Sequence, residues 1–192
     1  MTEQRPLRLF VAVGVPEHLL ESLSGATEEL RRGLPQGRWA PPENQHVTLK
    51  FLGSSPAGSL AEIGARVGVV SSAHRAAELR LGRLGTWPSR RRARVLWAGL
   101  ADEAGLLHSL AAGLDEALGP LGFEPEKREF TPHLTLARWR VPIPLDSPLP
   151  ELPDEARAPF TVGAVELFRS HLSPKGARYE VLRSFSLTST AQ

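Results

Sequence analysis

Two stretches of the chain repeat the order histidine, apolar residue, threonine, leucine. The first starts at His46 and the second at His133, so Thr48 and Thr135 each follow two residues after a histidine. Both stretches have the apolar character of β-strands, and in a strand residues i and i+2 point to the same face. Each histidine therefore shares a face with its threonine, while the apolar residues beside them can pack in a core.

Two imidazoles and two hydroxyls that meet across a cleft suit the chemistry of a phosphodiester. A neutral imidazole can accept a proton from water, and a protonated one can donate a proton to the leaving oxygen. Histidine serves both roles because its ordinary pKa is about 6.5. The hydroxyls can donate hydrogen bonds to the non-bridging oxygens. A core strand has no reason to place these polar residues on one face twice, so the repeat favours one shared active site.

The same histidine pair has two other conceivable uses. A zinc ion would need a third protein ligand, and the nearest carboxylates, Glu43 and Glu129, lie outside the two strands. We therefore expect no metal. Alternatively, the cleft could hold RNA ends without turning them over. The presence of both histidines favours catalysis over this binding module.

The motifs must be positioned by a fold that mixes strands and helices. Strand patterns cover 7–13, 46–52, 78–84, 95–100, 131–138, 160–168 and 178–187, and helical patterns cover 19–34, 60–70 and 106–118. The proline-rich segment 141–159 is expected to be a surface loop. This order predicts an α+β fold in a single domain, residues 1–192. We expect two related lobes whose antiparallel sheets face a central cleft, with helices outside.

The composition excludes several classes of chemistry. The chain has 192 residues, 41% of them hydrophobic, which is enough apolar material for a core. Cysteine is absent, so disulfides, thiolate zinc sites, iron–sulfur clusters and cysteine nucleophiles are excluded. No run of eighteen apolar residues and no signal peptide pattern is present, so we expect a cytoplasmic protein that does not bind membranes.

Arginine dominates the positive charge. The chain carries 23 Lys and Arg against 21 Asp and Glu, and only three of the 23 are Lys. The planar guanidinium group suits phosphate, so an anionic partner is permitted. The densest run is Ser89–Arg94, in which Arg90 and Arg92 are candidates for RNA contacts. The run could equally be a solvated hairpin tip.

Five stretches together resemble one known family. They are RLFVAVGVP, HVTLKFLG, RVLWAGL, TPHLTLAR and LFRSHLSPKGARYEVL, which occur in this order between about residues 7 and 187. They resemble the two-histidine (2H) phosphoesterase superfamily, and within it the bacterial and archaeal branch named 2'-5' RNA ligase or RNA 2',3'-cyclic phosphodiesterase. The resemblance implies a bilobal fold with a central cleft, no metal or other cofactor, and an RNA substrate. We expect a monomer.

The resemblance also implies roles for individual residues. His46 and His133 would be the catalytic pair, and Thr48 and Thr135 would bind the substrate phosphate. Arg138 closes the H-x-T-L-A-R pattern and would help to hold the phosphate. Strict alternation places Arg138 on the face opposite His133, so a bulge or the end of the strand must turn it inward.

Three further residues are candidates for contacts with the base or the RNA. Lys50 shares the parity of His46 and is expected either in the cleft as a cation or at its solvated rim. Phe10 and Phe51 could stack on a nucleobase, although a phenylalanine in an apolar strand is more often part of a core.

The implied reaction opens an RNA 2',3'-cyclic phosphate and leaves a 2'-phosphate. We assign His46 as proton donor and His133 as proton acceptor, although the sequence is symmetric and leaves the two roles open. By microscopic reversibility of 2'-5' linkage cleavage, the same site could join the cyclic end to a 5'-hydroxyl as a 2'-5' linkage without ATP, and no Walker A loop or adenylylation motif is present. A small cyclic phosphate remains an alternative substrate.

Overall fold

The computed structural model describes residues 6–174 and 176–189. Three α-helices and nine strands alternate along this part of the chain. The elements are β1 (Leu7–Val13), α1 (Glu17–Gly33), β2 (Arg38–Trp39), β3 (Val47–Ser55), α2 (Leu60–Ser72), β4 (Ala77–Trp87), β5 (Ala93–Ala101), α3 (Leu106–Leu118), β6 (His133–Ile143), β7 (Phe160–Val162), β8 (Ala164–Ser173) and β9 (Gly176–Ser186), with short 3-10 turns at η1 (Pro42–Asn44) and η3 (Arg90–Arg92).

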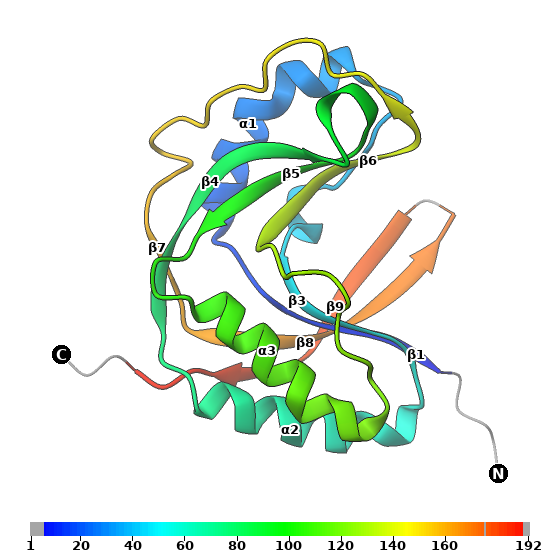
Figure 1. Cartoon of the computed structure of the whole chain (residues 1–192), viewed down its shortest axis with the longest axis vertical. Coiled ribbons are helices and arrows are strands. Elements are labelled where there is room, and N and C mark those ends of the chain that lie inside the picture. The colour runs from blue at the N-terminus through cyan, green and yellow to red at the C-terminus, as the bar shows by residue number, and fades with distance from the viewer. Residues whose placement is uncertain (1–5, 175, 190–192) are drawn as a thin grey trace.

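The strands form one strongly curled antiparallel sheet with two lobes. The order is β7-β4-β5-β6-β3-β1-β8-β9, and β2 adds to β6. The lobes meet where β3 lies beside β6, in the single pair Val47↔Leu134. Figure 1 shows the two lobes diverging from this junction, so that the sheet opens toward one side. The predicted bilobal α+β fold is therefore confirmed.

One lobe combines strands from the two ends of the chain, and the other takes four consecutive strands from the middle. One lobe contains β1, β3, β8 and β9, and the other contains β4, β5, β6 and β7. In Figure 1, α2 and α3 lie together beside the first lobe, while α1 lies beside the second. Among the described residues, no helix is long and apolar enough to cross a membrane.

The helices pack through one apolar face each. α3 buries five leucines and Ala111, and its first turn is fixed because Leu106 N and Leu107 N donate to the Asp102 carboxylate at 2.9 and 2.7 Å. A carboxylate at this end also interacts favourably with the helix dipole. Burial of each leucine side chain contributes about 1.5–3 kcal/mol.

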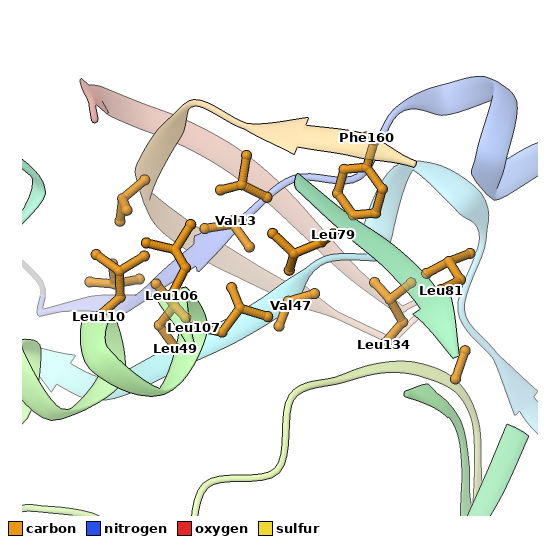
Figure 2. Packing of buried hydrophobic residues seen from close by; sticks show 14 of the residues in the cluster. Val13, Val47, Leu49, Leu79, Leu81, Leu106, Leu107, Leu110, Leu134 and Phe160 are labelled. Carbon is orange, nitrogen blue, oxygen red and sulfur yellow. The ribbon is translucent and has the colours of Figure 1, made fainter. Parts of the chain in front are cut away.

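The apolar residues of both motifs belong to this core. Val47 and Leu134 follow the two histidines and are 1% and 0% exposed. Figure 2 shows them packed among Leu49, Leu79 and the leucines of α3. The core thus holds one face of each motif strand and directs the opposite face, which carries the histidine and threonine, toward the space between the lobes.

A β-bulge interrupts each motif strand directly after its threonine. In β3, Thr48 pairs with Ala12 and Lys50 with Val11, so Leu49 is an extra residue. In β6, Thr135 pairs with Trp97 and Ala137 with Leu96, so Leu136 is an extra residue. A bulge of this kind shifts the alternation of faces by one residue. Two consecutive residues therefore point to the core in each strand.

The bulge in β6 explains Arg138. Leu136 and Ala137 are both buried, and Arg138 then returns to the face of His133 and Thr135. The predicted need for a bulge is confirmed.

The bulge in β3 corrects the expected position of Lys50. The side chain lies neither in the cleft nor at its rim, because the extra residue Leu49 turns Lys50 toward the core, where it is 2% exposed. Its ammonium donates to the carboxylate of Asp115 on α3 and to the carbonyl of Glu124 at 2.9 Å. Asp115 also accepts a hydrogen bond from Glu126 N at 3.3 Å. Lys50 therefore ties the first motif strand to the loop that leads to the second.

Other elements also differ from the predicted ones. The predicted strand 160–168 is wrong, because this stretch holds two strands: β7 pairs with β4 in one lobe, and β8 pairs with β1 in the other. The strand β2 has only two residues and was not predicted, since so short a segment carries no periodic signal. β6 continues to Ile143 and so takes the first residues of the expected loop 141–159.

Removal of Asp115 should destabilise the fold more than removal of Lys50. Asp115→Ala leaves a buried ammonium without its carboxylate and should lower the free energy of unfolding by about 3 kcal/mol. Lys50→Met removes the buried charge itself and leaves a partly exposed carboxylate, so it should cost about 1 kcal/mol or less. Urea unfolding of both variants measures this difference. A larger loss for Lys50→Met would contradict the assignment of the ammonium as the buried partner.

Candidate active site

The predicted site residues line one pocket between the two lobes. The pocket has a volume of about 620 Å³, and its lining includes His46, Thr48, His133, Thr135 and Arg138. A volume of this size is typical of small-molecule sites. The two motifs, which lie in different halves of the chain, are therefore brought together as expected.

His46 lies in a cluster of aromatic rings. Its ring centroid is 4.7 Å from that of Phe10 and 5.6 Å from that of Phe168, with planes within 24° of parallel. The ring of Tyr179 lies nearly perpendicular to that of His46, with the ring centroids 5.0 Å apart. These contacts fix the plane of the imidazole and leave it half-buried at the wall of the pocket.

The two phenylalanine candidates have different surroundings. Phe10 packs against Phe168 at 4.9 Å and is only 3% exposed, so its ring has no open face for a nucleobase. The expected stacking role of Phe10 is therefore corrected: the ring supports His46 from behind. Phe51 is 59% exposed and lines the pocket, because the bulge after Thr48 returns it to the open face.

His133 is held by its backbone and by a tryptophan. Its Nδ1 lies 2.7 Å from the carbonyl oxygen of Thr131. Since a carbonyl can only accept, Nδ1 carries the proton and Nε2 is the ring nitrogen left to exchange one. Trp87 sets its ring against the imidazole at 4.5 Å and 82°. His46 similarly forms a hydrogen bond with the backbone of Asn44, also two residues upstream.

Burial keeps both imidazoles neutral in the free protein. It lowers the pKa of His46 to about 4, against a smaller raising effect of the Asn44 backbone bond, and the charge of His133 lowers it further. Burial also lowers the pKa of His133, where the bond to Thr131 opposes the effect and the charge of Arg138 adds to it. Both rings are then proton acceptors at neutral pH.

Hydroxyl and guanidinium groups converge beside His133. Arg138 Nη2 donates to Thr135 Oγ1 at 3.2 Å. Arg8, Arg38 and Arg178 also line the pocket, and Glu43 is the one carboxylate among its described lining residues. The pocket is thus strongly cationic in a chain whose net charge is only +2. Such a lining favours an anion.

The arginine-rich turn lies outside this pocket. The guanidinium of Arg90 donates to the carbonyls of Leu145, Asp146 and Ser147 at 3.1, 3.1 and 2.7 Å. Arg90 therefore fastens the proline-rich segment to η3. Arg92 is exposed in the same turn. Contact of either residue with RNA stays a prediction.

Asn44, Trp87 and Tyr179 are site residues that the sequence did not reveal. The side chain of Asn44 donates to the carbonyl of Ala177 at 2.8 Å and so fastens the β8–β9 hairpin next to His46. Trp87 ends β4 and Tyr179 lies in β9. Their approach to the histidines depends on the order of strands in the sheet. For Tyr179 the available signals were the strand pattern of 178–187 and its place in the family-like stretch LFRSHLSPKGARYEVL.

The donor set does not form an evident metal site. Among residues 6–174 and 176–189, no group of three histidine, aspartate or glutamate side chains is placed to hold one ion. The two histidines have hydroxyl and guanidinium groups as neighbours, and these groups bind phosphate oxygens rather than divalent cations.

Comparison with known proteins assigns the family. The family model for LigT-like phosphoesterases matches residues 13–97 and 99–179. The chain belongs to the LigT-like phosphoesterase family. The predicted membership of the 2H phosphoesterases, and with it the expectation of an enzyme, is confirmed.

Relatives of this LigT-like phosphoesterase carry a common name. RNA 2',3'-cyclic phosphodiesterases of Thermus thermophilus and Methanothermobacter thermautotrophicus are 36% and 32% identical over 94% of this chain, which spans 90% and 99% of their lengths. The namesake of Geobacillus stearothermophilus is 32% identical over 93% of this chain, which spans only 56% of that protein.

Solved structures have the same fold. A Thermus thermophilus protein superposes with a TM-score of 0.83 and 30% identity, covering 96% of this chain and 100% of its own. E. coli LigT complexed with 3'-AMP superposes with a TM-score of 0.78 and 26% identity, covering 95% and 99% of the two chains.

The depressed pKa of His46 should make the fold sensitive to acid. The unfolded imidazole has a pKa of about 6.5, so between pH 6.5 and 4 the unfolded chain binds more protons and acidification favours unfolding. His46 alone should lower the free energy of unfolding by about 3 kcal/mol between pH 7 and pH 4. Urea unfolding across this range should show a flatter dependence for His46→Asn. Equal slopes in wild type and His46→Asn would refute the assignment.

Proposed function

We propose that this chain opens the 2',3'-cyclic phosphate at RNA ends to a 2'-phosphate, with His46 and His133 as a metal-independent acid–base pair. The names of its relatives and the 3'-AMP complex of E. coli LigT support a nucleotide substrate. The observation that carries the proposal is the convergence of both histidines, both threonines and Arg138 on one cationic pocket.

The first half of the reaction is attack by water. Nε2 of His133 accepts a proton from water, and the oxygen attacks phosphorus. The hydrogen bond from Nδ1 to the Thr131 carbonyl keeps Nε2 available as the acceptor. General-base help of this kind is worth about 10²–10⁴ in rate.

The second half is departure of the 3'-oxygen. The bond between phosphorus and the 3'-oxygen breaks, and protonated His46 donates its proton to that oxygen. Thr48, Thr135 and Arg138 would donate hydrogen bonds to the non-bridging oxygens, where charge accumulates. After one turnover His133 holds the proton and His46 lacks it, so exchange with solvent restores the pair.

Substrate binding supplies the conditions for His46 to act as an acid. In the free enzyme burial holds the pKa of His46 near 4. A phosphodiester anion beside the imidazole favours the charged form and raises its pKa. The bound anion therefore stabilises the protonated imidazole of His46, which burial destabilises in the free enzyme.

The same ring-opening steps with a different nucleophile would give ligation. A 5'-hydroxyl would replace water, lose its proton to one histidine and form a 2'-5' phosphodiester while the 3'-oxygen takes a proton from the other. This needs no ATP, because the strained cyclic phosphate is the activated group. Hydrolysis should prevail unless the second RNA end is held in place, since water is always present. We expect the enzyme to act as a cytoplasmic monomer on RNA ends.

Single alanine substitutions test the two-histidine mechanism. His46→Ala and His133→Ala should each lower the turnover of a nucleoside 2',3'-cyclic phosphate by about 10²–10⁴. EDTA should leave the wild-type rate unchanged. The matched control His74→Ala, whose ring contacts Ser109 outside the pocket, should stay near the wild-type rate. Near-normal turnover by either motif variant, or loss with EDTA and rescue by zinc, would refute the mechanism.

The roles of acid and base can be separated by the leaving group. A phosphodiester with a 4-nitrophenolate leaving group needs little protonation, so His46→Ala should cleave it at nearly the wild-type rate while His133→Ala should not. The opposite pattern would exchange the two roles. Chromatography of the product from the cyclic substrate distinguishes 2'-phosphate from 3'-phosphate.

The pH dependence of kcat/KM should reflect the lowered pKa values. This parameter reports the free enzyme, in which the pKa of both histidines lies below its ordinary value. Because one imidazole must be protonated, kcat/KM should peak below pH 6.5 and fall about tenfold per unit above it. The optimum of kcat should lie at higher pH, since bound substrate raises the pKa of the acid. A kcat/KM maximum above pH 7.5 would contradict the proposal.

A further inference from the structure

A second cationic groove adjoins the active-site pocket. It has a volume of about 500 Å³ and is lined by Arg31, Arg32, Arg38, Trp39 and Glu28, together with neighbouring backbone. We name it the outer groove. Arg31 and Arg32 lie in the last turn of α1, and Arg38 and Trp39 form β2.

The outer groove and the active-site pocket share two residues. Arg38 and Trp39 line both of them. β2 pairs with β6 at Arg38↔Arg138 and Trp39↔Ala137, so the shared segment begins beside the arginine that bonds to Thr135. In Figure 1 the chain after α1 passes from the outer end of β6 down to the space between the lobes. The two hollows therefore meet at β2, and we call the pair of them the track.

Most of the charge in the outer groove is not neutralised by the protein. Glu28 accepts a hydrogen bond from Arg32 at 3.2 Å. Arg31 and Arg38 have no carboxylate partner among the described residues. Cationic side chains at a helix C-terminus compensate the helix dipole, which accounts for Arg31 and Arg32 but not for Arg38 on β2. The surplus charge extends along the track.

Trp39 gives the track a rigid aromatic wall. Its Nε1 donates to the carbonyl of Leu34 at 3.2 Å, and its ring meets Trp139 edge-on at 6.2 Å. Gly37 lies so close that an added Cβ would be 2.8 Å from Nε1 of Trp39 and 2.9 Å from Nε1 of Trp139. The indole is thus fixed while its remaining surface lines both hollows. Grooves that combine arginines with fixed aromatic rings are typical sites for single-stranded nucleic acid.

We propose that the outer groove binds the RNA strand upstream of the cyclic phosphate. Arg31, Arg32 and Arg38 would contact its phosphates, and Trp39 would contact a base. The proposal rests on the proposed function, and it specifies the substrate as an RNA strand of several nucleotides rather than a free nucleoside cyclic phosphate.

The test compares substrates of two lengths. The probes are a nucleoside 2',3'-cyclic phosphate and a tetranucleotide with the same terminal nucleoside 2',3'-cyclic phosphate. Wild type should show a kcat/KM about tenfold or more higher for the tetranucleotide, and Arg31→Ser/Arg32→Ser should reduce this ratio to near one. The logarithmic salt dependence of tetranucleotide binding should become shallower by about 0.7 for each phosphate that the double variant no longer neutralises.

A matched control and the separate outcomes make the result decisive. Arg80→Ser removes an exposed arginine from the groove beside β4 and should leave the length ratio unchanged. The outer groove proposal fails, while the proposed function stands, if wild type turns over the nucleoside cyclic phosphate but shows no preference for the tetranucleotide. The same holds if the double variant retains the wild-type preference for the tetranucleotide. If wild type turns over neither substrate, the proposed function itself fails.

Discussion

The break in strand alternation after each threonine is the constraint on which the site depends. In a regular strand, His46 and Thr48 would share a face with Lys50. His133 and Thr135 would share a face with Ala137 instead of Arg138. One extra residue, Leu49 or Leu136, resets the alternation in each strand. The pocket then receives Phe51 from one strand and Arg138 from the other, at equivalent positions. The two motif strands thus share the same backbone geometry, but this position carries an aromatic ring in β3 and a guanidinium group in β6.

The bulges also show where prediction from the sequence succeeds. The repeated His-x-Thr pattern was enough to identify four residues of the pocket, because strand alternation holds across three residues. The bulge in β6 could be inferred because the family resemblance requires Arg138 in the cleft, while strict alternation places it on the face opposite His133. The bulge in β3 was hidden, since a lysine follows Leu49 and a buried lysine is rare without a partner. Its partner Asp115 lies on a helix 65 residues away.

The aromatic surroundings of the histidines were beyond the reach of local patterns. Trp87 and Tyr179 approach the imidazoles from β4 and β9, so their positions follow from strand order. These rings, together with Phe10 and Phe168, surround the imidazoles with apolar surface and so disfavour their charged forms. Two protonated imidazoles in one such pocket would repel each other, and the nearby guanidinium of Arg138 adds to this effect. In the free enzyme both imidazoles are therefore neutral, and an anion in the pocket would favour the protonated form of one of them.

The pairing of the first strand with a strand near the end of the chain has a consequence for folding during synthesis. β1 lies between β3 and β8, so the first strand of the chain reaches its second neighbour only after residues 164–173 have been synthesised. Until then one side of β1 is an open edge, and such edges invite pairing with other chains. Contacts between segments this far apart in sequence also slow folding. Almost the whole chain must therefore be synthesised before the complete sheet around the pocket can form.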